Sequence, residues 1–511
     1  MRVLFVYPRY PDTFWSFRHA LRFVSKKAVN PPLGLLTVAA MLPATWEKKL
    51  VDMNVAPLKD ADIQWADYVF ISAMVVQRDS ARDTIARCHT LGTRVVAGGP
   101  LFTTEPEEFD EVDHLVLDEA EVTLPLFLAD LDKDAAGHVY TSGERPDVTR
   151  TPIPLWPLID MDKYVSMNIQ YSRGCPFDCE FCSIVVLNGR RPRTKTAEQL
   201  LAEMESLYDA GWRGSLFIVD DNFIGNKRKL KAEVLPAIIE WSRKHKHPFL
   251  FFTEASVNLA DDDELMRLMV EAGFNRVFVG IETPNEDSLT ECSKFANRNR
   301  DLVASVRKIH SFGMEVQGGF IVGFDSDPLS IFRRQIEFIQ NSGIVTAMVG
   351  LLDAPRGTRL YQRLLKENRL VKSSTGNNTD ASINFIPKMR YETLLSGYQQ
   401  ILETIYAPRQ YYERIRTFLK EYKPYQVRRG VVIRLVYLAA FFRSIWVLGV
   451  LDQGRKHYWR LFFSTLLRRP RLFPLSMILS IYGVHFRRVI EELRGSYAPP
   501  ASADVVDTDG A

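Results

Sequence analysis

The sequence predicts an α/β protein with a doubly wound, Rossmann-like parallel sheet, a partial (β/α)6 barrel of the TIM type and a helical C-terminal region. Short apolar runs alternate with amphipathic stretches from residue 2 to about 132, and the same alternation starts again after residue 165. Strands that alternate with helices indicate parallel sheets. Strand-like runs stop after about residue 390, where the chain becomes basic and rich in aromatic residues.

The first predicted domain, residues 1–132, has five strands, and the stretches 35–42 and 79–91 between them have clear helical periodicity. Ligands of doubly wound sheets bind at the carboxyl ends of the strands. Gly98 and Gly99 follow one such end, where they either let a ligand approach the backbone or form a tight turn. The five strands are Val3–Tyr7, Leu50–Met53, Tyr68–Ala73, Val95–Ala97 and Leu115–Leu117.

Residues 133–165 have the composition of a linker, with charges, glycine and four prolines. Residues 166–390 then repeat the alternation in six strand-and-helix units, which fit a partial barrel whose active face lies at the carboxyl ends of its strands. The clearest helices of this series are 262–272 and 300–312. Its strands are Met167–Tyr171, Ser215–Val219, Phe249–Thr253, Arg276–Ile281, Val316–Val322 and Ala347–Leu352.

The cysteine content points to a cytoplasmic protein. Five cysteines are few for 511 residues, and three of them lie within eight positions. This pattern argues against the disulfide framework of a secreted protein. The apolar run before Pro8 is too short for a signal peptide. We therefore expect thiols kept in a reducing compartment.

Cys175, Cys179 and Cys182 form a C-x3-C-x2-C motif directly after the first strand of the second series. Closely spaced thiolates ligate iron–sulfur clusters, and three ligands leave one of four irons open to a chelating molecule. The motif therefore predicts a [4Fe-4S] cluster on these cysteines. A zinc site would need a distant fourth ligand such as Cys88 or Cys292, and a disulfide would leave one thiol unpaired. A chance grouping of cysteines is the remaining alternative.

The cysteine motif, with Phe181 before its last cysteine, and the barrel around it resemble the radical S-adenosylmethionine (SAM) superfamily. The preceding sheet domain resembles the cobalamin-binding domain of the B12-dependent radical SAM class. The resemblance covers residues 1–390 and implies a [4Fe-4S] cluster, SAM and cobalamin as cofactors. It also implies an electron donor such as ferredoxin or flavodoxin.

Four strand ends of the second series resemble the segments with which this class binds SAM. They are the stretch 219–227, the residue after the third strand, the stretch 280–283 and the G-x-I-x-G stretch 319–323. Any one carboxylate at a strand end is as often a helix cap as a ligand contact. The residues that the resemblance assigns to SAM are Asp220, Asp221, Asn222, Glu254, Gly280, Glu282, Gly319 and Gly323.

The predicted cobalamin domain lacks the D-x-H-x-x-G motif whose histidine replaces the lower cobalt ligand in another kind of cobalamin domain. None of His19, His89, His114 and His138 stands in that pattern. Many B12-dependent radical SAM enzymes also lack the motif, so the resemblance implies a cobalt without a histidine below it. The predicted cobalamin contacts are Asp52, Asn54, Gly98 and Gly99.

The cofactor pair implies radical methylation of an unactivated carbon. SAM cleavage supplies a radical that removes hydrogen from the substrate, and methylcobalamin supplies the methyl group. No catalytic residue is identified beyond those that hold the cofactors. The alternatives are a B12-dependent radical SAM enzyme without methyl transfer, such as an oxidative cyclase acting on a tetrapyrrole, and a non-catalytic iron–sulfur or zinc scaffold.

The region 391–500 is strongly basic, and residues 401–500 carry 18 Lys and Arg against 6 Asp and Glu. Val431–Leu451 is apolar, but Arg434 and Arg443 oppose a membrane span, and 472–484 is too short for one. The pattern favours helices on an anionic membrane face over a solvated helical bundle, and it disfavours nucleic-acid binding. We expect residues 501–511 to be disordered. The predicted headgroup contacts are Arg455, Lys456, Arg460, Arg468, Arg469 and Arg471.

Three features resemble the hopanoid C-2 methylase group and its uncharacterised relatives: the lead-in 170–172, the D-D-N-F-I-G-N-K segment 220–227 and the C-terminal extension. Ser183 departs from the group, in which an aspartate is expected after the third cysteine. The resemblance implies a small-molecule or lipid substrate, with a hopanoid as the specific expectation. The basic and apolar pattern of residues 391–500 predicts peripheral contact with the inner face of the cell membrane.

Overall fold

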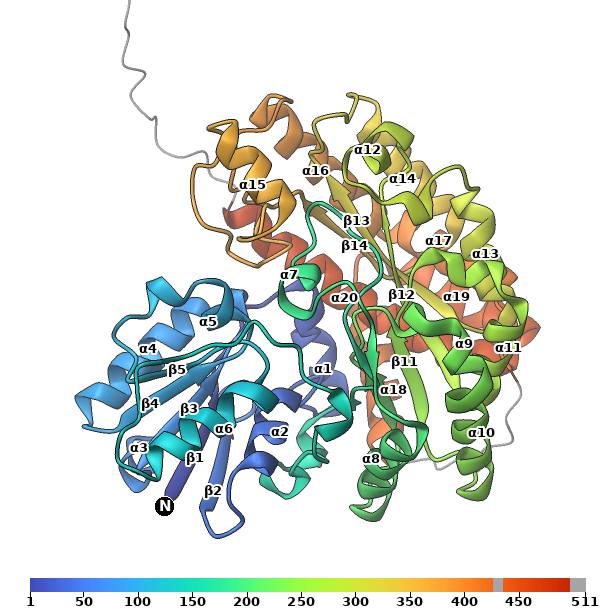
Figure 1. Cartoon of the computed structure of the whole chain (residues 1–511). Coiled ribbons are helices and arrows are strands. Elements are labelled where there is room, and N and C mark those ends of the chain that lie inside the picture. The colour runs from blue at the N-terminus through green and yellow to red at the C-terminus, as the bar shows by residue number, and fades with distance from the viewer. Residues whose placement is uncertain (426–434, 497–511) are drawn as a thin grey trace, which may run out of the picture.

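The computed structural model describes residues 1–425 and 435–496. The predicted disordered tail 501–511 and the first part of the apolar stretch 431–451 lie outside the described residues. Figure 1 shows the N-terminal sheet domain in blue, the barrel in green and yellow beside it, and the C-terminal helices in orange and red against the barrel.

The N-terminal domain contains a parallel sheet with the strand order β2-β1-β3-β4-β5-β6. The five predicted strands are present, and the edge strand β2 starts earlier than predicted, in a charged stretch whose side chains are largely exposed. A sixth strand, β6, falls within the predicted linker, where its two residues were too few to produce a strand pattern. The strands are β1 (Arg2–Tyr7), β2 (Glu47–Asp52), β3 (Tyr68–Ser72), β4 (Arg94–Gly98), β5 (His114–Val116) and β6 (Val139–Tyr140).

Helices cover both faces of this sheet, so the doubly wound prediction is confirmed. Alternate residues of β1 enter different cores: Val3 and Phe5 pack with α2 and α6, whereas Leu4 and Val6 pack with α3, α4 and α5. Both sets of side chains are fully buried. The helices are α2 (Leu33–Met41), α3 (Asp60–Trp65), α4 (Arg78–Thr90), α5 (Pro100–Thr104) and α6 (Ala120–Leu131).

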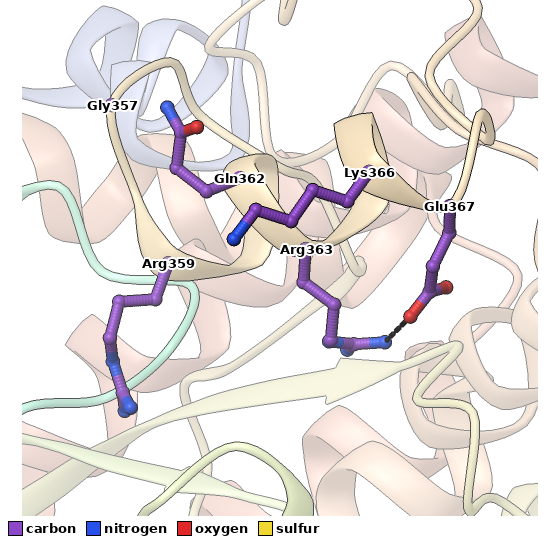
Figure 2. Close-up of a pocket in the computed structure, with 6 residues that line it drawn as sticks. All are labelled: Gly357, Arg359, Gln362, Arg363, Lys366 and Glu367. Atoms are coloured by element: carbon purple, nitrogen blue, oxygen red, sulfur yellow. Dashed lines mark ion pairs between the residues drawn. The ribbon is translucent and has the colours of Figure 1, made fainter.

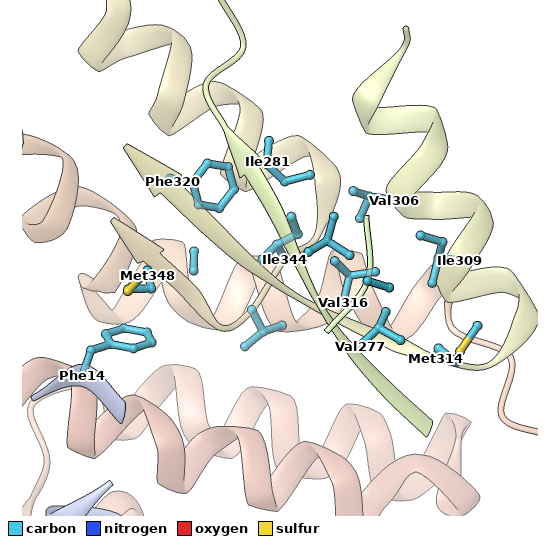
Figure 3. Close-up of a cluster of buried hydrophobic side chains, with 14 of the residues drawn as sticks. Phe14, Val277, Ile281, Val306, Ile309, Met314, Val316, Phe320, Ile344 and Met348 are labelled. Atoms are coloured by element: carbon cyan, nitrogen blue, oxygen red, sulfur yellow. The ribbon is translucent and has the colours of Figure 1, made fainter. Parts of the chain in front are cut away.

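The second domain is an open barrel of six parallel strands in the order β14-β13-β12-β11-β10-β7. All six predicted strands are present. Figure 3 shows Val277 and Val316 on the outer face of the barrel, packed against Val306 and Ile309. The strands are β7 (Ser166–Ile169), β10 (Ser215–Ile218), β11 (Leu250–Glu254), β12 (Phe274–Glu282), β13 (Glu315–Val322) and β14 (Ala347–Leu351).

Local capping explains where the best predicted barrel helices begin and end. Asp262 and Asp301 accept hydrogen bonds from the first turns of α11 and α13, and both helices end at a glycine with positive φ, Gly273 and Gly313. The barrel helices are α7 (Ile184–Asn188), α8 (Ala197–Asp209), α9 (Lys227–Lys229), α10 (Leu235–Lys244), α11 (Asp263–Ala272), α12 (Glu286–Glu291), α13 (Leu302–Phe312), α14 (Ile331–Ser342) and α15 (Arg359–Lys366).

The C-terminal helices pack against the barrel and against a segment that leaves the N-terminal domain after β1. In that segment, Phe14 stacks on Phe486 with ring centroids 4.3 Å apart, and its carbonyl oxygen lies 2.9 Å from His485 Nε2. Among the described residues, no helix has both the length and the apolar character needed to cross a membrane. The elements are α1 (Arg18–Val24), α16 (Tyr391–Tyr406), α17 (Pro408–Glu421), α18 (Leu435–Trp446), η11 (Val447–Leu451), α19 (Arg455–Arg468) and α20 (Phe473–Ser496).

Candidate functional site

The cysteine loop leaves the barrel through a two-stranded neck. β8 (Ser172–Arg173) pairs with the antiparallel β9 (Arg193–Thr194), so both ends of the loop are held together. Gly174 follows β8 with φ +96°, and a side-chain carbon there would lie 2.9 Å from the carbonyl oxygens of Gly189 and Arg191. The Cys175 N–H donates to the Gly189 carbonyl over 3.2 Å. Only glycine fits this position without displacing the backbone beside the first cysteine.

The three cysteines of this loop lie close enough to influence one another. Burial raises the pKa of each thiol, that of Cys182 to about 12, and Cys175 and Cys179 add to the effect on Cys182. The Lys294 ammonium acts in the opposite direction on all three. A largely buried positive charge beside one buried and two half-buried thiols suits thiolates that carry iron.

The cysteine motif differs from a site for a single metal ion. Among the described residues, no three His, Cys, Asp or Glu side chains are grouped to hold one metal ion. A [4Fe-4S] cluster binds each cysteine through a different iron, so its three ligands stand apart around the cluster. The loop thus supplies three thiols without requiring them to converge on one ion.

Asp220, the first carboxylate after β10, braces the start of the cysteine loop. Its two carboxylate oxygens accept hydrogen bonds from the Tyr171 N–H over 2.8 Å and from the Ser172 hydroxyl over 2.5 Å. Burial raises the pKa of Asp220 to about 7, against the effect of these donors. The structure therefore places this predicted SAM residue beside the site, with both oxygens engaged by the protein.

Asp221 and Asn222 lie nearer to the cysteines. Asp221 Oδ2 accepts from the Gly174 N–H over 2.8 Å and from Asn188 Nδ2 over 3.0 Å. The Asn222 amide nitrogen lies 3.9 Å from Cys175 Sγ. The segment after β10 thus fixes the first cysteine from two directions.

Glu254, at the end of β11, has a carboxylate that makes no side-chain hydrogen bond or ion pair with any other described residue. Burial raises its pKa to about 8, the nearby Asp221 adds to this rise, and Lys294 opposes it. These interactions place Glu254 in the same centre as the cysteine loop. A carboxylate without a protein partner is free to accept hydrogen bonds from a bound molecule.

Glu282, at the end of β12, pairs with a residue that the sequence reasoning missed. Lys294 Nζ lies 2.7 Å from Glu282 Oε1. Burial alone would lower the pKa of Lys294, but Glu282 and Cys179 outweigh burial, so its pKa is raised. Glu282 adopts φ +63°, and its carboxylate folds back over Gly280, where a side-chain carbon would lie 2.3 Å from Oε1. Lys294 stands in no motif, so only the fold brings it to the cysteines.

Gly319 and Gly323, on β13 and directly after it, serve different packing needs. A side-chain carbon on Gly319 would lie 2.8 Å from the Phe278 ring. Gly323 has φ +109°, and its N–H donates to Asp327 Oδ2 over 2.9 Å. Burial raises the pKa of Asp327 to about 6, against its hydrogen bonds. Gly319 lies in the second half of β13 and Gly323 directly after it, and contact of both with SAM stays a prediction.

An aromatic surface lies deeper in the barrel, on the inner face of the strands. Side chains alternate along strands, and the opposite face is fully packed against helices. Phe217 stacks on Phe252 with centroids 4.4 Å apart, and Trp15 lies edge-on to Phe278 at 5.5 Å. The Trp15 indole N–H also points to Met348 Sδ, 3.3 Å away. The four aromatic side chains are half-buried, and Met348 is buried.

The carboxyl edge of the N-terminal sheet holds the four predicted cobalamin contacts. Asp52 accepts hydrogen bonds from the Tyr164 hydroxyl over 3.0 Å and from the Asn54 side chain over 2.8 Å. Gly98 and Gly99 let neighbouring segments approach, because a side-chain carbon would lie 2.5 Å from Val116 O and from Ser72 Oγ, respectively. The edge is therefore built of glycine backbone and of a carboxylate bonded to the end of the predicted linker.

The four histidines of this domain lie away from these contacts. His114 starts β5 at the opposite edge of the sheet, and His138 precedes β6. His89 lies in the last turn of α4, 3.1 Å from Asp113, whereas His19 approaches Glu492 of α20. The cobalt without one of these histidines below it stays a prediction.

Known proteins match nearly the whole chain. Residues 169–339 match the radical SAM superfamily, residues 23–128 match the B12 binding domain, and residues 358–498 match a domain of unknown function (DUF4070). An uncharacterised methyltransferase of Synechocystis is 44% identical, over 97% of this chain and 93% of that protein. The hopanoid C-2 methylase of Rhodopseudomonas palustris is 34% identical, over 91% of this chain and 90% of that protein.

Solved structures share the fold. OxsB, a cobalamin-dependent SAM radical enzyme solved with aqua-cobalamin and SAM, has a TM-score of 0.61 and 14% identity, covering 97% of this chain and 80% of its own. The radical SAM methyltransferase TsrM of Kitasatospora setae was solved with cobalamin and a [4Fe-4S] cluster. It has a TM-score of 0.58 and 14% identity, covering 97% of this chain and 99% of its own. Together with the sequence relatives, the cysteine loop and the paired sheet domain, these findings show that the chain belongs to the cobalamin-dependent radical SAM methyltransferases.

Proposed function

We propose that this enzyme methylates an unactivated carbon of a polycyclic membrane lipid of the hopanoid class. The observation that carries the proposal is the 34% identity to a hopanoid C-2 methylase along nine-tenths of both chains. The half-buried aromatic rings inside the barrel support it, because a fused hydrocarbon skeleton packs well on such rings.

The proposed roles of the site residues follow from their positions. Cys175, Cys179 and Cys182 hold the [4Fe-4S] cluster, and the free carboxylate of Glu254 receives polar groups of SAM. Asp221 and the other predicted SAM positions shape the pocket around it, while the carboxyl edge of residues 1–132 holds cobalamin. When bound, the cluster and SAM supply the radical, and cobalamin supplies the methyl group. The barrel residues orient the substrate and exclude water.

The proposed lipid substrate agrees with an apolar face on the C-terminal helices. The side chains of this C-terminal apolar face are strongly exposed, with Phe442 at 65%, Trp446 at 60% and Leu467 at 78%. Phe442 belongs to α18 and Leu467 to α19. The two helices contact each other through aromatic side chains, since the ring centroids of Phe441 and Phe462 lie 6.2 Å apart. Two packed helices thus present large apolar side chains to the outside.

The charge around this face suits an anionic membrane. Between residues 453 and 490 the chain has no acidic residue, and the predicted headgroup contacts all lie in this interval. Arg468 and Arg471 are exposed and make no ion pair with any described residue. Exposed apolar side chains beside unpaired cations are the features of a peripheral membrane surface. We infer that the enzyme reaches its substrate at the inner face of the cell membrane.

Vesicle binding tests the membrane proposal. The holoenzyme should cosediment with phosphatidylglycerol vesicles and less with phosphatidylcholine vesicles. The F442S/L467S variant should lose this binding several-fold. The F295S/L329S variant is the matched control, since Phe295 and Leu329 are 61% and 70% exposed on the barrel. Equal binding by all three proteins would contradict the proposal.

Product analysis tests the chemistry and the substrate together. The anaerobically reconstituted enzyme, supplied with cobalamin, SAM and a reductant, should form 5′-deoxyadenosine and S-adenosylhomocysteine. Hopanoid lipid should gain the mass of one methylene unit. The C175A/C179A/C182A variant should form none of these products. Cofactor turnover without any hopanoid product would contradict the substrate while leaving the family chemistry intact.

A further inference from the structure

We propose that a basic rim around the cysteine loop is the docking surface for an acidic one-electron carrier that reduces the cluster. The proposal rests on the function proposed above, which requires an electron from outside. The basic rim consists of Arg190, Arg191, Arg359 and Lys366, all of them exposed. Two residues follow α7 and two belong to α15, so distant segments converge on one surface.

The rim surrounds the loop that carries the cluster ligands. Arg190 Nη1 and Arg359 Nε approach the same atom, Asp178 Oδ2, at 3.7 Å and 3.6 Å. Asp178 immediately precedes Cys179. Arg359 also donates to the Asp178 carbonyl over 2.6 Å. A carrier bound on the rim would therefore lie directly over the loop, which matters because electron transfer slows steeply with distance.

Two cavities are lined by residues of the basic rim. One, of about 410 Å³, is lined by Arg359, Arg363 and Lys366 of α15, with Glu367 as its acidic residue, and Figure 2 shows the two arginines extending from the same side of that helix. The other, of about 720 Å³, is lined by Arg145, Arg190, Arg191, Arg193 and Lys229, with Asp147 as its acidic residue.

The charges of the rim are available to a partner. Arg191 and Lys366 make no ion pair with any described residue. Arg190 and Arg359 share the single carboxylate of Asp178 at long distances and remain 61% and 52% exposed. By contrast, Arg363 forms ion pairs with Glu180 and Asp325. An unneutralised positive surface accelerates the encounter with an acidic protein and makes it salt-dependent.

Stopped-flow reduction of the holoenzyme cluster tests the proposal, with reduced flavodoxin and a reduced ferredoxin as probes. The R190E/R191E/K366E variant should be reduced at least about tenfold more slowly at low salt by the carrier that serves the enzyme. Wild type should slow as salt increases, and the variant should not. The K133E/R333E/R409E variant matches the charge change at exposed positions outside the rim and should behave like wild type.

Photoreduced deazaflavin, a small neutral donor, separates docking from cluster integrity. It should reduce wild type and both variants equally and should support the same 5′-deoxyadenosine formation. If neither carrier distinguishes the rim variant from wild type, or if the control variant is slowed as much, the docking surface is wrong. If deazaflavin produces a reduced cluster without 5′-deoxyadenosine in wild type, the proposed chemistry fails instead.

Discussion

Arg173 Nη2 lies 2.7 Å from Glu121 Oε1, and this ion pair joins the barrel to the N-terminal domain two residues before the first cysteine. Arg173 also reaches Glu119, 2.8 Å away, and only 13% of its side chain is exposed. Burial would raise the pKa of Glu121, but Arg173 outweighs burial and lowers it to about 2. The position of the cysteine loop is thus coupled to the predicted cobalamin domain.

Replacing Arg173 by Met should destabilise the protein by about 3–5 kcal/mol, because Glu121 would remain buried without its partner. Iron incorporation should fall as well, since β8 carries the loop. Urea unfolding and iron analysis check both effects. The R409M variant removes an exposed i,i+4 pair with Glu413 and should cost no more than about 0.5 kcal/mol. Equal losses in both variants would contradict the role of the buried pair.

The Arg173–Glu121 ion pair also predicts that the folded protein loses stability at acid pH. The folded pKa of Glu121, about 2, lies below its ordinary value, so the unfolded chain binds the proton more readily as pH falls. The stabilisation is complete above about pH 4.5 and is lost as the pH falls toward 2. In the E121Q variant this loss should be smaller than in wild type between pH 5 and pH 3. Parallel stability curves for the two proteins would contradict it.

Removing the Lys294 charge should lower the reduction potential of the cluster, because a buried cation near the cysteines favours the added electron. The K294M variant should show this shift in an EPR redox titration, and it should also unfold at lower urea concentration, since Glu282 loses its 2.7 Å partner. K294R retains the charge and should restore part of the potential. The K231M variant, whose ion pairs are at the surface, serves as the control. An unchanged potential in K294M would contradict this electrostatic role.

Local patterns predicted the elements of this fold, whereas contacts between distant segments escaped them. The strands and the cysteine motif are continuous in sequence, so apolar runs and spacing revealed them. Lys294 has no such signal, because its position beside the cysteines depends on the turn that brings it back to Glu282. Asp52 looked like a free strand-end ligand, yet it bonds Tyr164, 112 positions away. A single sequence carries no record of such pairings.

His310 predicts a second pH effect, which arises in the core. Its ring is fully buried on α13, 4.8 Å from the Phe418 ring, and burial lowers its pKa to about 3. The unfolded histidine binds a proton near pH 6.5, so stability falls as the pH drops below that value. Relative to wild type, H310F should gain about 2 kcal/mol between pH 7 and pH 5. The exposed His138 gives the control variant H138F, which should follow wild type.

Gly174 and Gly92 allow the cost of left-handed backbone strain to be separated from the cost of a steric clash at the side-chain carbon. Gly92 and Gly174 have φ values of +74° and +96°, but a side-chain carbon meets nothing within 4 Å at Gly92, whereas at Gly174 it meets two carbonyl oxygens at 2.9 Å. G92A should therefore cost only the left-handed strain of a non-glycine residue, about 1 kcal/mol. G174A should cost clearly more and should lower the iron content, because the collision displaces the backbone next to Cys175. Urea unfolding and iron-to-protein ratios measure both variants. Equal stability and full iron content in both would show that the neck of the loop yields without disturbing the first cysteine.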